Sequence, residues 1–219
     1  MNKFQAVFAD GFTKVPFLTC GDPDLAATAA KARAAVQAGA KMLVLAIPFS
    51  DPTAESPARQ AASVRALRSG TTTAGILEMV QALRQDVQVP LVFSTYANVV
   101  FSYKAAEGEG GAAGFIAASR AAGIDGLFVT DLPYEEKEEF QDFCQQQGIA
   151  LLSAVAPASE TRIAMIAQEA EGFLLVTAAS GETLQRTLRT VRMTSDLPCL
   201  VDGSVLGAED LASGVLVDQ

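Results

Sequence analysis

One unit recurs along this chain: a helix ends at a glycine, and a short apolar strand follows. It is seen in AGAKMLVLAI (38–47), AGIDGLFVTD (122–131) and QGIALLSAV (147–155). Glycine is favoured just past a helix because that position takes a positive φ angle. Strands that are apolar on both faces and are joined by helices indicate a parallel sheet covered on both sides. The repeat therefore constrains the chain to an α/β fold.

The same pattern extends over the whole sequence and predicts eight strands. Their ranges are Val15–Thr19, Met42–Ile47, Val89–Ser94, Gly126–Thr130, Ala150–Val155, Phe173–Thr177, Pro198–Val201 and Gly214–Val217. The helices expected between them are Leu25–Ala38, Pro57–Arg68, Ala74–Arg84, Gly114–Ala122, Glu135–Gln147, Glu160–Ala170 and Glu182–Thr194. Eight such strands predict a (β/α)8 TIM barrel, with an N-terminal helix over Phe4–Phe12 and without the last, C-terminal helix. Because no linker divides the sequence, we expect a single domain over residues 1–219.

Composition excludes several classes of function. The net charge of −9 argues against nucleic-acid and anionic-membrane partners. No apolar run approaches the ~20 residues that span a bilayer. The sequence has no histidine, which removes the commonest general base and metal ligand. Three widely spaced cysteines indicate reduced thiols in a cytoplasmic protein and not a metal site.

The segment from Leu43 to Pro57, LVLAIPFSDPTAESP, is the most informative about function. An apolar strand runs directly into a polar loop that holds Asp51 and Glu55. In α/β folds the carboxyl ends of the strands carry the chemistry. Any reaction here would therefore rest on carboxylates, tyrosine, lysine or backbone dipoles.

Five motifs lie in order at strand ends and together resemble one family, the tryptophan synthase alpha subunits. They are PFLTCGDP (16–23), IPFSDP (47–52), YAN (96–98), DLP followed by two glutamates (131–136) and VAP (155–157). The family cleaves indole-3-glycerol phosphate to indole and glyceraldehyde 3-phosphate by a retro-aldol route. The resemblance implies this reaction in tryptophan biosynthesis, with no metal or cofactor on this chain.

The resemblance also assigns the two catalytic positions, and both are changed. The family's acid/base glutamate is Val44 here, and its aspartate is Glu55. An isopropyl group cannot transfer a proton, and losing a general acid/base typically lowers the rate about 10²–10⁴-fold. The extra methylene of Glu55 shifts its carboxylate by about an ångström, which lowers the rate further.

The remaining substrate-binding positions also come from the resemblance. Phe17 and Tyr96 match the indole pocket wall, and Asp131 and Val155 match other substrate contacts. The phosphate loops correspond to Gly181, Thr183, Gly203 and Ser204, and two acids that stand among them, Asp202 and Asp218, would disfavour a phosphate. The Gly-rich segment Ala105–Gly114 is interpreted as a surface insertion, with a phosphate-binding loop as the alternative.

Partner residues follow in the same way. Asp51, Asn98 and Pro133 match the surface that faces a beta subunit, which would carry pyridoxal phosphate. Asp51 has an alternative interpretation as a helix N-cap or turn residue, and the other two are ordinary loop residues. Two hypotheses thus remain open: an impaired lyase that relies on Glu55, and a non-catalytic pseudoenzyme that docks on a beta subunit or binds another small ligand, whether indole-like or phosphate-bearing.

Overall fold

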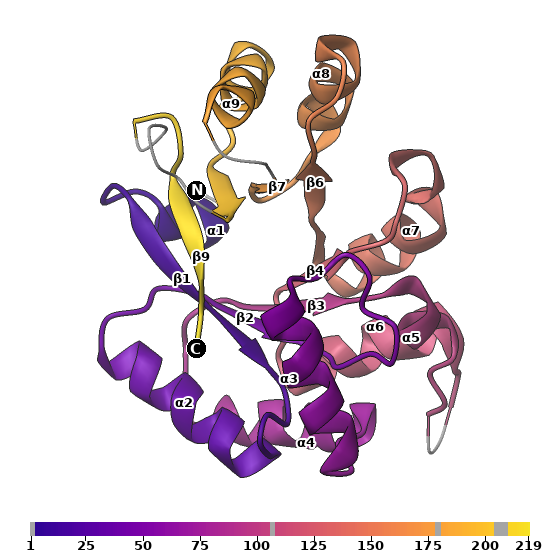
Figure 1. Ribbon diagram of the computed structural model, residues 1–219. Coiled ribbons are helices and arrows are strands. Elements are labelled where there is room, and N and C mark those ends of the chain that lie inside the picture. The colour runs from indigo at the N-terminus through magenta and orange to yellow at the C-terminus, as the bar shows by residue number, and fades with distance from the viewer. Residues whose placement is uncertain (1–2, 106–107, 178–180, 204–209) are drawn as a thin grey trace. The chain divides into compact units, whose positions relative to one another are not determined.

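The computed structural model describes residues 3–105, 108–177, 181–203 and 210–219. Its contacts group the chain into two compact units. One unit consists of Pro16–Leu151 with Gln219, and the other of Met1–Val15 with Leu152–Asp218. Figure 1 shows that both units are built of strands and helices, with one or two helices between most successive strands. The single-domain assignment stays a prediction.

The larger unit contains a parallel sheet whose strands follow the order of the sequence. Its strands are β1 (Thr13–Thr19, which begins in the other unit), β2 (Leu43–Ala46), β3 (Leu91–Thr95), β4 (Gly126–Val129) and β5 (Ala150–Leu151). Its helices are α2 (Leu25–Gln37), α3 (Pro57–Arg68), α4 (Thr73–Leu83), α5 (Ala97–Phe101), α6 (Gly111–Ala122), the 3₁₀ helix η1 (Tyr134–Glu136) and α7 (Glu138–Gln147). Each neighbouring pair of strands is parallel, as the apolar repeat predicts.

Alternate residues of each strand in this unit serve two different faces. Leu43 and Leu45 of β2 belong to the hydrophobic core that the helices cover, together with Phe93 of β3. Successive side chains of a strand point to opposite faces of the sheet. Val44 therefore points away from the helices, and so does Phe17, whose neighbour Leu18 lies in the helix-covered core.

The smaller unit repeats the pattern with α1 (Lys3–Val7), β6 (Ser153–Val155), α8 (Glu160–Glu169), β7 (Leu174–Thr177), α9 (Glu182–Thr194), β8 (Cys199–Asp202) and β9 (Gly214–Asp218). Strands β6 to β9 are parallel and again follow the sequence order. The ring centroids of Phe4 and Phe173 lie 5.6 Å apart, edge to face. This aromatic contact joins α1 to the residue that immediately precedes β7.

The predicted elements are confirmed to within two residues at their ends, with five corrections. The helix predicted over Glu135–Gln147 is divided at Lys137 into the 3₁₀ helix η1 and the α-helix α7. The fifth strand is divided at Leu152, because β5 pairs with β4 whereas β6 pairs with β7. The N-terminal helix ends at Val7 and does not reach Phe12, since the chain turns there and Thr13 N–H donates to Ser213 O at 3.1 Å. Helix α5 was not predicted, and five residues are too few for a periodic signal. Helix α6 begins at Gly111, so the end of the Gly-rich segment is helical and not loop.

Within the described ranges, no helix is both long and apolar enough to cross a membrane.

Candidate active site

Val44 occupies a buried position in the middle of the larger unit's sheet. Its side chain is 5% exposed, and its partners across the sheet are Phe17 of β1 and Val92 of β3. Phe17 is equally buried, with 4% of its surface exposed. The structure thus places the predicted catalytic position beside the predicted aromatic wall, on the face turned away from the helices. A hydrocarbon side chain thus occupies the position to which the resemblance assigns the proton carrier.

The loop after β2 delivers Glu55 to the start of α3. Ser56 is the N-cap of that helix, because its hydroxyl accepts from Arg59 N–H at 3.3 Å, and Pro57 follows at the first position. The Gln60 amide donates to the Glu55 carbonyl at 2.9 Å. Asp51 is therefore not the N-cap. It is an exposed turn residue whose carbonyl accepts from Thr53 N–H at 2.9 Å.

Arg59 links Glu55 to Phe17, and sequence reasoning missed it. Its Nη1 lies 3.1 Å from Glu55 Oε2, and the two side chains are 9% and 11% exposed. Its Cζ lies 3.7 Å from the centroid of the Phe17 ring, a cation–π contact. The spacing of Glu55 and Arg59, four residues apart at a helix start, was the signal that could have revealed the pair.

Tyr96 stands at the end of β3 and is 5% exposed. Its ring stacks on Phe49 with centroids 4.9 Å apart. Its hydroxyl is buried and makes no hydrogen bond of normal geometry with any described residue. Burial, and then the Glu55 carboxylate nearby, raise the pKa of Tyr96 to about 12, although the backbone of Ala54 acts in the opposite direction. Tyr96 is thus a buried, neutral side chain near the Glu55 carboxylate.

Asp131 has a structural partner in this unit. Its Oδ1 accepts from Ala97 N–H at 2.7 Å, which ties the end of β4 to the start of α5. Asn98 is exposed on α5, and its carbonyl accepts from the Ser102 hydroxyl at 2.5 Å. Pro133 is also exposed and precedes η1. The two predicted partner-facing residues, like Asp51, thus lie at the surface of the larger unit.

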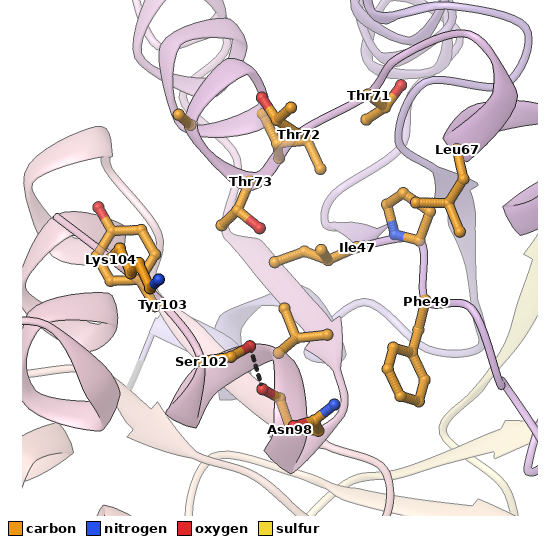
Figure 2. Close-up of a pocket in the computed structure, with 14 residues that line it drawn as sticks. Ile47, Phe49, Leu67, Thr71, Thr72, Thr73, Asn98, Ser102, Tyr103 and Lys104 are labelled. Carbon is orange, nitrogen blue, oxygen red and sulfur yellow. Dashed lines mark hydrogen bonds between the residues drawn. The ribbon is translucent and has the colours of Figure 1, made fainter. Parts of the chain in front are cut away.

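A pocket of about 320 Å³ adjoins this surface (Figure 2). Asn98 and Phe49 line it, together with Thr72 at the start of α4 and Tyr103 and Lys104 after α5. Figure 2 shows the hydrogen bond between Ser102 and Asn98 within this lining. Phe49 therefore contacts Tyr96 and also lines a surface pocket.

The predicted residues of the smaller unit lie at its strand and helix ends. Val155 is buried in β6 opposite Val176. Gly181 has φ of 74° and precedes α9, where the carbonyl of Thr183 accepts from the Thr187 hydroxyl at 2.9 Å. Gly203 follows β8 with φ of 131°. Ser204 lies outside the described residues, and these positions stay predictions as ligand contacts.

Among the residues that the structure describes, the side chains that could bind a metal are Asp, Glu and Cys, since the sequence has no histidine. No group of three or more His, Cys, Asp or Glu side chains there is arranged to hold a metal ion. Cys20, Cys144 and Cys199 are all buried. Burial raises the pKa of Cys20 to about 12 and that of Cys199 to about 11. These thiols are packing residues in the structure.

Comparison with known proteins identifies the relatives of this arrangement. Residues 7–207 match the family model described as tryptophan synthase alpha chain. The alpha chain of Alkaliphilus metalliredigens is 37% identical in an alignment of 218 positions that covers 95% of this chain and 79% of that one. The alpha chain of Prochlorococcus marinus is 39% identical over 196 residues, 89% of this chain and 69% of that one.

Solved structures agree with the sequence relatives. The alpha subunit of Legionella pneumophila superposes with a TM-score of 0.87 at 28% identity, covering 100% of this chain and 86% of that one. A chain from the Pyrococcus furiosus tryptophan synthase a2b2 complex has a TM-score of 0.86 at 28% identity, covering 95% and 87%. The predicted TIM-barrel fold is thereby confirmed. The chain belongs to the tryptophan synthase alpha chain family.

Proposed function

We propose that this chain is a tryptophan synthase alpha-type protein in which the family's lyase reaction is impaired. That reaction is the retro-aldol cleavage of indole-3-glycerol phosphate to indole and glyceraldehyde 3-phosphate. The observation that carries the proposal is Val44, a buried hydrocarbon beside Phe17 at the position of the acid/base glutamate. We expect no metal or cofactor on this chain.

The expected loss of rate follows from the missing proton carrier. Cleavage requires a proton at the indole carbon that leaves the glycerol chain, and a base for the glycerol hydroxyl. A positioned acid/base typically contributes about 10²–10⁴-fold to such a step. Glu55, the carboxylate at the second catalytic position, is the proposed substitute, but Arg59 Nη1 lies 3.1 Å from its Oε2. A carboxylate paired with a guanidinium is a weaker base, because the pairing favours its charged form.

Docking on a beta subunit is the part of the family function that these changes leave intact. Asp51, Asn98 and Pro133 are all exposed on the larger unit. The related Pyrococcus furiosus chain is described in an a2b2 complex with mutual activation. In this chain the corresponding partner would be a beta subunit that carries pyridoxal phosphate.

A second candidate is a pseudoenzyme whose only role is docking or the binding of another small ligand. The specific observation in its favour is the ion pair between Glu55 and Arg59, because it engages the carboxylate at the second catalytic position. Both catalytic positions would then have lost their function.

The test is to follow indole release from indole-3-glycerol phosphate, with and without a matching beta subunit. The unaltered protein is compared with Val44→Glu and with the control Val64→Glu, which adds the same charge at an exposed site of α3. Slow release that Val44→Glu raises by roughly 10²-fold supports the impaired lyase. Silence in all three proteins, with stimulation or binding of the beta subunit, supports the pseudoenzyme. Family-level rates from the unaltered protein would contradict both candidates.

A further inference from the structure

The face of the Phe17 ring is already covered within this chain. The Arg59 guanidinium carbon lies 3.7 Å from the ring centroid. This is the separation at which two carbon atoms are in van der Waals contact. A planar guanidinium at that distance occupies the space in which another flat group would stack on this face.

Two contacts hold Arg59 in this position: the ion pair with Glu55, one helical turn away, and the contact with the Phe17 ring. Only 9% of the Arg59 side chain is exposed. Moving Arg59 outward would break its contact with the ring and leave the Glu55 carboxylate, 11% exposed, without that partner. A buried charge that loses its partner is strongly unfavourable. The conformation in which Arg59 covers the Phe17 ring should therefore dominate.

We propose that Arg59 determines which ligands this site accepts, because it closes the Phe17 face to flat aromatic rings. Indole is the natural probe, and that choice rests on the proposed function of the chain. The effect is separate from Val44, since binding a ring requires no proton transfer. The site is thus changed in its selectivity as well as in its chemistry.

The variants separate shape from charge. Arg59→Met keeps a long apolar stem but removes the planar head. Glu55→Gln combined with Arg59→Met also removes the Glu55 carboxylate charge, which Arg59→Met alone would leave buried without the guanidinium. Arg59→Lys keeps a cation above the ring and beside Glu55. Arg68→Met is the matched control, because Arg68 is an exposed arginine of the same helix.

The assay is equilibrium titration with indole, followed by the fluorescence of the ligand. The chain contains no tryptophan, so indole emission comes from the ligand alone. If fewer than a tenth of the molecules have Arg59 displaced, removing its head should strengthen indole binding by roughly tenfold or more. We expect this gain in Arg59→Met and in the double variant, and parent-like weak binding in Arg59→Lys and Arg68→Met.

Three results would overturn the inference. They are tight indole binding by the unaltered protein, no gain in the two variants that lack the guanidinium while circular dichroism shows them folded, or an equal gain in Arg68→Met. If Arg59→Met does not fold, the double variant decides the question. Because the readout is binding and not indole release, a failure here leaves the lyase and docking tests unaffected, and their failure leaves this result interpretable.

Discussion

Replacing Arg59 by methionine should destabilise the protein by about 4 kcal/mol. Breaking a buried ion pair by removing one partner costs about 3–5 kcal/mol. The lower end of this range, about 3 kcal/mol, applies here because Glu55 lies in a loop at a helix start and its side chain is 11% exposed. The lost contact with Phe17, at 3.7 Å, adds about 1 kcal/mol. For a chain of this size, such a change lowers the melting temperature by roughly 8–16 °C.

The double variant Glu55→Gln with Arg59→Met shows how much of this loss of stability comes from the buried Glu55 charge. Burying a neutral amide costs about 1–3 kcal/mol, less than burying an unpaired charge, so the double variant should be more stable than Arg59→Met alone. Urea unfolding followed by circular dichroism measures both free energies. The reasoning is refuted if the two variants are equally unstable, or if Arg59→Met loses less than about 1 kcal/mol, the value of a solvent-exposed pair.

Three further predictions concern other contacts in the larger unit. Arg84 pairs with Asp125 and donates to Gly123 O at 2.7 Å, and Asp125 is 7% exposed. Arg84→Met should therefore lower the unfolding free energy by about 3 kcal/mol in urea titrations. The bidentate pair with Arg65, both bonds 2.7 Å long, holds the pKa of Asp22 below its usual value. This stability is present above the ordinary aspartate pKa of about 3.9 and is lost as the pH falls through the lower folded value, so Arg65→Met should destabilise at pH 7 but not in strong acid. Cys20, with its pKa raised to about 12 by burial, should resist iodoacetamide at pH 8 until urea unfolds the chain, and mass spectrometry reads the modification.

Periodicity determined most of the fold. The helices Pro57–Arg68 and Glu182–Thr194 were predicted to the residue, because Ser56 and Pro57 mark one start and Gly181 precedes the other. The break at Leu152 could not be predicted in this way. Apolar residues continue through it, and only the pairing of β5 with β4 and of β6 with β7 divides the strand.

For the site, the order of residues in the motif LVLAIPFSDP predicts by resemblance that Val44 stands at the family's acid/base glutamate position, and that assignment stays a prediction. The structure decided what surrounds it. Whether Arg59 lies in solvent or over Phe17 depends on contacts between residues 42 positions apart, and no local pattern encodes them. The capping of α5 by Asp131 and the burial of Tyr96 are likewise properties of packing. The order of residues determines which chemical group stands at a position, whereas the tertiary fold determines which neighbouring side chains contact that group.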